Sequence, residues 1–210
     1  MASDSLNVAE TVDMFRFVSK FMIDQKDILT KADQKIGDGD HGIGIARGFE
    51  AIIDLLETTQ FDELGVLLKK IGFGLMNSMG GASGAIFGTL FLGGAKAINN
   101  QDCLDSENLG LMLQGGLDAV KNRGKANPGD KTMVDALEPA ALAADSQISL
   151  TDNLAAVTEA SRLGMEKTKE MVANFGRAKS LGEKAVGHAD PGSISMHLLL
   201  KSMTEYVQKR

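Results

Sequence analysis

The chain contains a single cysteine, Cys103, so no disulfide can form within it. Nothing around Cys103 has the spacing of a metal site or a redox pair, and the simplest inference is a reduced, cytoplasmic setting. Long apolar runs are also missing, because the most apolar stretch, residues 85–98, is interrupted by glycines. Residues 1–5 lack the basic and apolar regions of a secretion signal. We therefore expect a soluble cytoplasmic protein that does not contact membranes.

An excess of positive charge is lacking as well, since 28 acidic residues face 22 basic ones and the net charge is −6. This balance disfavours extended contact with nucleic acid or anionic lipid. Hydrophobic residues make up 43% of the 210 residues, which is enough for one core. Because no internal repeat or flexible linker interrupts the pattern, we expect one domain over residues 1–210.

Strand signals are scarce, because no segment alternates apolar and polar residues and no hairpin dipeptide separates two apolar runs. Apolar residues instead recur at steps of three and four, the spacing of one helix face. Eight segments have this pattern: residues 8–22, 45–56, 64–75, 83–95, 106–124 and 131–144, one that starts near Thr151, and one that starts with Asp190 as N-cap and Pro191 as first helical residue. Short connections favour antiparallel neighbours, so we predict an all-α fold, an eight-helix antiparallel bundle or barrel.

The first unusual connection is acidic, with Asp33, Asp38 and Asp40 within eight residues. Three carboxylates around one turn repel one another unless a cation is present, and oxygen ligands suit Mg²⁺ or Ca²⁺. An EF-hand is excluded, because Ile43 and Phe49 stand where that loop needs glycine and glutamate. We therefore predict a magnesium site in this connection, and a solvated acidic turn without metal is the alternative.

Glycines in the same connection form a G-x-G-x-x-G pattern at Gly37, Gly39 and Gly42. A dinucleotide site would need a buried strand before this pattern, and residues 30–35 do not form one. We therefore do not interpret these glycines as a dinucleotide fingerprint.

Three further connections are rich in glycine or positive charge. Residues 77–84 place glycines and Ser83 at a helix start, which is typical of an anion site, although a plain turn with Ser83 as N-cap fits equally well. Residues 122–133 are basic but contain no Walker sequence, and residues 176–192 contain Arg177, which could complement phosphate charge. Taken alone, each of these last two fits an ordinary surface loop. His41, beside the aspartates, could bind nucleotide or support the carboxylates.

Together these segments resemble the nucleotide-binding L subunit of bacterial dihydroxyacetone kinase, and the equivalent C-terminal domain of the single-chain, ATP-dependent kinases of that family. The matching runs are Gly-Asp-Gly-Asp-His-Gly at 37–42, Gly-Gly-Ala-Ser-Gly at 80–84, Arg-Gly-Lys-Ala-Asn-Pro-Gly-Asp-Lys-Thr-Met at 123–133 and Gly-His-Ala-Asp-Pro-Gly at 187–192. The resemblance extends over nearly the whole chain. It implies an eight-helix antiparallel barrel with the nucleotide and metal site at loops on one end.

The resemblance also implies roles for individual residues. Asp33, Asp38 and Asp40 would hold two Mg²⁺ ions that bridge the phosphates of ADP or ATP. Arg177 would be catalytic, because it would offset charge on the transferred group. The residues that line the nucleotide would be His41, Gly42, Gly44, Gly80, Gly81, Ala82, Ser83, Gly124, Thr132, Met133, Arg177, Asp190, Pro191 and Gly192. The resemblance places an asparagine where this chain has Gly44, so the polar contact that it implies at this position has no side chain to make it.

The implied activity is that of a phosphotransferase, a subunit of a kinase for dihydroxyacetone or a related short ketose. The ketose would be held by a separate K subunit. The phosphoryl donor would be either a phosphotransferase-system protein that recharges bound ADP, or free ATP. A transcription regulator is a further candidate partner. The alternative function is a non-catalytic helical protein of the same fold that senses nucleotide or metal.

Overall fold

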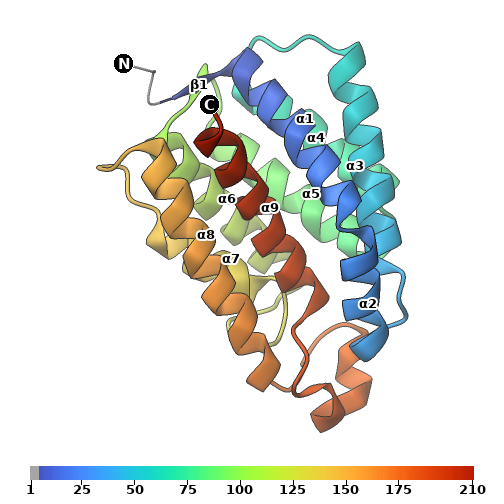
Figure 1. Cartoon of the computed structure of the whole chain (residues 1–210). Coiled ribbons are helices and arrows are strands. Elements are labelled where there is room, and N and C mark those ends of the chain that lie inside the picture. Colours follow the sequence, from blue (N-terminus) through green and yellow to red (C-terminus); the bar gives the residue numbers. More distant parts are fainter. Residues whose placement is uncertain (1–4) are drawn as a thin grey trace.

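The computed structural model describes residues 5–210, which are mostly helical (Figure 1). Residues 1–4, on which most of the expectation about a secretion signal rests, lie outside the described residues. The elements are β1 (Leu6–Asn7), α1 (Val8–Asp24), α2 (Lys26–Ile36), α3 (His41–Thr58), α4 (Leu64–Ser78), α5 (Gly81–Ala97), β2 (Cys103–Leu104), α6 (Ser106–Gly124), α7 (Val134–Ala143), α8 (Leu150–Lys167), the 3₁₀ helices η1 (Thr168–Glu170) and η2 (Arg177–Ala185), and α9 (Pro191–Gln208). The predicted all-α class is confirmed.

Eight of the α-helices in the described part of the chain form a closed ring. Helix α1 packs against α9 and α3, and the ring continues through α4, α5, α6 and α7 to α8 and back to α9. Neighbours run in opposite directions, so every second connection lies at the same end (Figure 1). Residues 25–40, 79–80, 125–133 and 168–190 therefore gather at one end, opposite the chain termini. The predicted eight-helix antiparallel barrel is confirmed, and so is the placement of the unusual loops at one end.

The helix count needs one correction, because α2 is a ninth α-helix among residues 5–210, lies outside the ring and packs against α3, α9 and η2. Its buried residues are Leu29, Asp33 and Ile36, spaced as one helix face. The middle position of this face is a carboxylate, so the apolar pattern was too short to predict a helix. Asp33 accordingly lies on a helix and not in a loop.

A second correction concerns the start of α7, which begins at Val134 and not at Lys131. Lys131 has a φ of 59°, in the left-handed region, which a right-handed helix cannot accommodate. The residues before Val134 form a turn in which the backbone N–H of Val134 donates to the hydroxyl of Thr132 at 3.2 Å.

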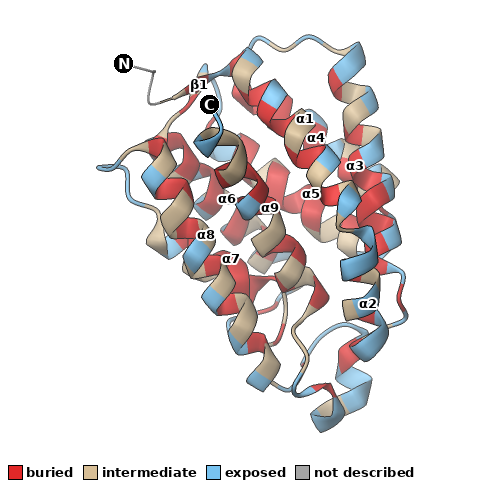
Figure 2. Ribbon diagram, in the orientation of Figure 1, coloured by how far each residue is buried: buried red, intermediate tan, exposed pale blue. Residues whose placement is uncertain are grey.

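The apolar faces of the ring helices point inward and form the core, as the buried residues in Figure 2 show. Phe15, Phe49 and Phe87 are fully buried, and the rings of Phe15 and Phe91 meet edge to face at 5.8 Å. In the part of the chain that the structure describes, no helix is both long and apolar enough to span a membrane.

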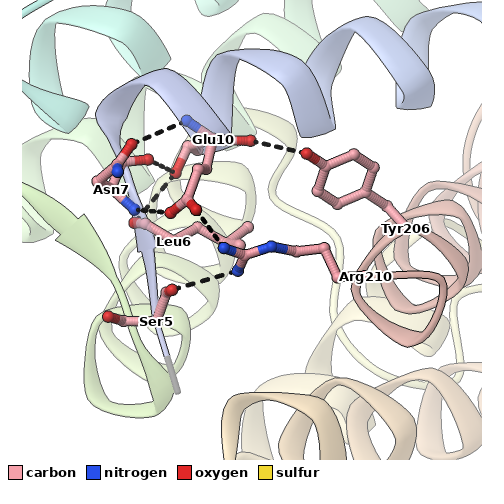
Figure 3. A network of polar contacts seen from close by, with 7 residues as sticks. Ser5, Leu6, Asn7, Glu10, Tyr206 and Arg210 are labelled. Atoms are coloured by element: carbon pink, nitrogen blue, oxygen red, sulfur yellow. Dashed lines mark hydrogen bonds and ion pairs between the residues drawn. The ribbon is translucent and has the colours of Figure 1, made fainter. Parts of the chain in front are cut away.

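The two ends of the described chain are joined by polar contacts on the side of the barrel far from the unusual loops (Figure 3). Arg210 forms an ion pair with Glu10 and donates a hydrogen bond to the carbonyl of Ser5. Glu10 and Asn7 form a capping box at the start of α1. These contacts join the C-terminal end of α9 to the start of α1, where the ring closes.

Candidate functional site

A cavity of about 540 Å³ opens at the end of the barrel where the four connections meet. All four contribute to its wall, together with α2 and the first turns of α3, α5 and α9. Most of the predicted site residues line this cavity: Asp33, Asp38, Asp40, His41, Gly44, Gly80, Gly81, Ala82, Ser83, Thr132, Met133, Arg177, Asp190, Pro191 and Gly192. Residues up to 159 positions apart in the chain, Asp33 and Gly192, are thus brought together at one place.

Two of the predicted residues, Gly42 and Gly124, are not part of this lining. A Cβ atom at Gly42 would lie 2.2 Å from the carbonyl oxygen of Lys26, so this glycine allows α2 and α3 to pack closely. Gly124 ends α6, and a Cβ atom there would lie 3.3 Å from Cδ1 of Ile86, which does line the cavity. Both glycines therefore allow close packing directly behind residues that line the cavity.

The acidic residues converge as the sequence predicted. One carboxylate oxygen from each of Asp33, Asp38 and Asp40 lies within 4.8 Å of the others. Asp33 is buried, and its Oδ2 accepts the backbone N–H of His41 at 3.2 Å, whereas Asp38 and Asp40 are exposed. Gly39, with a φ of 80°, makes the turn that brings the two exposed carboxylates to the same side. Three oxygen ligands with open positions suit a hard divalent cation such as Mg²⁺.

Arg177 reaches this acidic group from the segment between α8 and α9. Its guanidinium lies 2.6 Å from Oδ2 of Asp38, and 70% of its side chain is exposed. The cationic residue and the three carboxylates therefore share one mouth of the cavity.

His41 is the first residue of α3 and connects three helices. Its Nε2 lies 2.7 Å from the hydroxyl of Ser195 on α9, and its Nδ1 lies 3.1 Å from the hydroxyl of Ser83 on α5. The Ser195 hydroxyl donates to the carbonyl of Pro191, so it accepts from Nε2–H, and Nδ1 accepts from Ser83. Burial lowers the pKa of His41, and the carboxylates of Asp33 and Asp40 oppose this shift only in part. A neutral imidazole thus fixes the geometry of the site.

The start of α5 presents backbone N–H groups to the cavity. Gly80 precedes the helix with a φ of 75°, and no side chain caps the first turn. The alternative in which Ser83 is a simple N-cap is wrong, because Ser83 lies inside the helix and bonds to His41. An uncapped helix N-terminus beside a cavity is a ready site for an anion such as phosphate.

Lys131 is a lining residue that the sequence reasoning did not single out. Only 1% of it is exposed, and its Nζ donates to the carbonyls of Thr168 at 2.5 Å and His188 at 2.6 Å. Burial lowers the pKa of this amine, an effect opposed by the nearby carboxylates of Asp190 and Asp135. No sequence signal reveals this role, because both partners are main-chain carbonyls distant in the chain.

Asp190 caps α9 as predicted, accepting the backbone N–H of Ser193 at 2.7 Å, and Pro191 is the first helical residue. Burial raises the pKa of Asp190 to about 7, and the charge of Asp135 adds to this shift. The ammonium of Lys131 acts in the opposite direction.

Apolar side chains complete the wall and were also not predicted as site residues. Met79, Ile86 and Phe87 are contributed by the α4–α5 region, and Ile43 and Phe175 lie at the more exposed parts of the lining. The cavity therefore combines anion-binding, cation-binding and apolar surfaces, as expected for a site that takes a nucleotide with its metal.

Comparison with known proteins agrees with this geometry. The family model of the DAK2 domain matches residues 35–205. The ADP-binding subunit DhaL of PEP-dependent dihydroxyacetone kinase 1 from Listeria innocua is 38% identical over 87% of this chain and 88% of its own length. The corresponding DhaL subunit from Escherichia coli is 34% identical over 95% of this chain and 97% of its own length.

A solved structure adds a three-dimensional match. The dihydroxyacetone kinase from C. freundii in complex with AMP-PNP and Mg²⁺ superimposes with a TM-score of 0.74 and 29% identity. The match covers 98% of this chain and 36% of that chain. On the family match over residues 35–205 and the identity to the two subunits, the chain belongs to the DAK2 domain family and is of the DhaL type.

Proposed function

We propose that the chain is the ADP-binding subunit of a PEP-dependent dihydroxyacetone kinase. In this role it passes a phosphoryl group from its nucleotide to dihydroxyacetone or a related short ketose. The observation that carries this proposal is the convergence of three carboxylates, an uncapped helix start and Arg177 in one cavity. Phosphoryl transfer requires these parts, since it is catalysed chiefly by positioning and by neutralising charge.

Asp33, Asp38 and Asp40 would hold Mg²⁺, and we propose two ions, as the resemblance to the kinase family implies. Bound metal would offset the charge on the phosphate chain. The fit rests on the donor set, which consists of oxygen atoms only and leaves positions open for phosphate and water.

The remaining contacts come from the chain itself. The N–H groups of Gly81, Ala82 and Ser83 would donate to phosphate oxygens. Arg177 would stabilise charge on the transferred group, and His41 would keep the starts of α3, α5 and α9 in register. The base and ribose would lie along the remaining lining: Gly44, Gly80, Thr132, Met133, Asp190, Pro191, Gly192 and the apolar residues Met79 and Ile86.

The proposal includes two partners, a K subunit that holds the ketose and a phosphotransferase-system protein that recharges bound ADP. Sequence identity to two subunits named PEP-dependent and ADP-binding is 38% and 34%, and sequence identity to the dihydroxyacetone kinase of Citrobacter freundii is 33%. The names of these two subunits support recharging of bound ADP over exchange of free ATP. The relatives' names give no support to a transcription regulator as partner.

The test begins with protein purified in Mg²⁺ buffer, which is denatured so that any released nucleotide can be identified by chromatography. We expect ADP in near-stoichiometric amount. The protein is then mixed with a K subunit, a phosphotransferase-system donor and dihydroxyacetone, and the sugar phosphate is measured. Bound ADP with no sugar phosphate would point to a sensor without catalysis. An empty protein that binds neither ADP nor ATP with Mg²⁺ would refute the proposal.

A further inference from the structure

The segment that carries Arg177 is a loop with few ties to the barrel. Residues 175–187 contain η2 and three glycines with positive φ, Gly176, Gly182 and Gly187, and added Cβ atoms at these glycines would meet nothing within 4 Å. Within the described chain, the ion pair of Arg177 with Asp38 is the one polar contact that a side chain of this loop makes outside it. Two of its residues, Ala178 and Ala185, are buried in a small cluster with Ile36 and Ala173.

The first end of the loop is held by Asp130. The backbone N–H of Asn174 donates to the carbonyl of Asp130 at 3.1 Å, and the side-chain amide of Asn174 donates to Oδ1 of Asp130 at 2.7 Å. Oδ2 of Asp130 accepts the backbone N–H of Asn127 at 2.7 Å, which holds the carboxylate in place. Residue 174 is thus joined to the α6–α7 connection by two bonds.

The second end is held by the next residue in the chain, Lys131, and by a bond of 2.7 Å from the backbone N–H of Gly187 to the carbonyl of Lys169. The buried ammonium of Lys131 bonds at once to the carbonyl of His188, where the loop ends, and to the carbonyl of Thr168, where α8 gives way to η1. The hydroxyl of Thr168 also accepts the backbone N–H of Asp190 at 3.0 Å. Lys131 has a left-handed backbone, with a φ of 59°, and the consecutive residues Asp130 and Lys131 bond to the two ends of the loop.

We propose that Asp130 and Lys131 are positioning residues for phosphoryl transfer. They fix the loop of residues 175–187 at its flanking residues, 174 and 188, and thereby place Arg177 at the mouth of the cavity. This inference rests on the proposed function. Both residues act through Arg177, because a loop with three open glycines would otherwise sample many arrangements. Lys131 also lines the cavity, whereas the contacts of Asp130 described above all lie within the two loops.

The decisive variant is Asn174→Asp, which places a second carboxylate against Asp130 and breaks their side-chain bond. The double variant Asp130→Asn with Asn174→Asp exchanges the two groups and keeps every bond, since the amide of residue 130 can accept from Asn127 and donate to residue 174. Gln114→Glu is the matched control, because it sets an acid against Asp118 on the surface of α6 and does not touch the loop. Lys131→Met tests the second end of the loop. If Lys131→Met does not fold, the double variant at residues 130 and 174 still tests the positioning role at the first end.

Two measurements are made, amide hydrogen exchange of residues 175–187 and the kinetics of transfer. In Asn174→Asp we expect exchange of the loop to accelerate and kcat to fall, each by about tenfold, with the affinity for ADP and Mg²⁺ changed less than about threefold. The double variant Asp130→Asn with Asn174→Asp should restore the wild-type hydrogen exchange of the loop and the wild-type kcat. Gln114→Glu should leave both quantities unchanged. Faster exchange with unchanged kcat, or unchanged exchange in Asn174→Asp, would overturn the positioning role. If the wild type transfers no phosphoryl group, the proposed function fails together with the positioning role, while hydrogen exchange still reports whether the ends are anchored.

Discussion

The guanidinium of Arg177 lies 2.6 Å from Oδ2 of Asp38, so a residue proposed to act on phosphate is paired with a residue proposed to bind metal. The ion pair of Arg177 with Asp38 and the proposed binding of metal by Asp38 compete, because a bound cation would offset the negative charge that holds Arg177. Metal binding would therefore release Arg177 toward the cavity, and the pair connects the loading of the site with the position of its cationic group.

The variant Arg177→Ala tests this competition. Without nucleotide, it should bind Mn²⁺ several-fold more tightly than the wild type, because a competing positive charge is gone. With nucleotide and partners, transfer should slow more than nucleotide binding weakens. Mn²⁺ binding is measured by electron paramagnetic resonance titration and transfer by sugar phosphate formation. Lys179→Ala, which removes an exposed cation from the same loop, is the control. Weaker nucleotide binding with an unchanged rate would make Arg177 a binding residue only.

Removing a carboxylate should abolish metal-dependent binding. In Asp38→Ala and Asp40→Ala, we expect the stabilisation by ADP with Mg²⁺ to disappear, because each variant removes one charged oxygen ligand from the group of three that would hold the ion. Thermal unfolding with and without Mg²⁺ measures this effect. Asp62→Ala, which removes an exposed acid from the α3–α4 connection at the other end of the barrel, should retain the full shift. Normal stabilisation in both site variants would refute the metal assignment.

The carboxyl of Asp190 should give stability a characteristic pH dependence. Its pKa is raised to about 7 in the folded protein, while an unfolded chain has a value of about 4. The folded state thus binds this proton more tightly, so the contribution of Asp190 to the free energy of unfolding falls as the pH rises from about 4 to about 7 and is constant above that range.

Asp190→Asn retains an N-cap acceptor for Ser193 and cannot ionise. The free energy of unfolding of the wild type minus that of this variant should therefore become smaller as the pH rises from about 4 to about 7. Chemical denaturation at a series of pH values measures it. A difference that does not change with pH would contradict the raised pKa.

Gly44 packs closely against the connection between α4 and α5. A Cβ atom there would lie 3.1 Å from the carbonyl oxygen of Met79, directly before the Gly80 turn. Gly110 is also inside a helix, but its added Cβ would meet Ala144 at an ordinary 3.5 Å. Alanine at Gly110 should stabilise the protein by up to about 1 kcal/mol, the usual gain in helix propensity.

Alanine at Gly44 should lose that gain and weaken nucleotide binding, because α3 must move away from the turn at the start of α5. Denaturation and nucleotide titration of both variants measure the two effects. Equal stabilisation by the two substitutions would show that the turn yields easily and that Gly44 does not constrain it.

Much of the arrangement could be predicted from spacing alone. Alternation around an antiparallel ring places every second connection at one end, so the acidic, glycine-rich and basic loops had to meet once the helices were identified. Helix α2 escaped prediction because Asp33 occupies the middle of its buried face, where an apolar residue would have marked the pattern. The residue that carries chemistry thus concealed the element that holds it.

Lys131 escaped prediction for a different reason. Lysine is rarely buried, and its partners are main-chain carbonyls 37 and 57 residues away. Backbone acceptors leave no mark in a sequence, so only the folded chain reveals the bond. The same holds for the hydroxyl of Ser195, which meets His41 across 154 residues.

Because the ring separates the loops from the termini, the molecule can be attached to a surface without covering its cavity. The 18 residues of α9 span about 27 Å from Pro191, at the cavity, to the end that carries Arg210. A linker joined after Arg210 would therefore hold the protein by its distal end and present the open face to soluble partners. Immobilised in this way, the chain would be suited to measuring the arrival and departure of a ketose-loaded subunit.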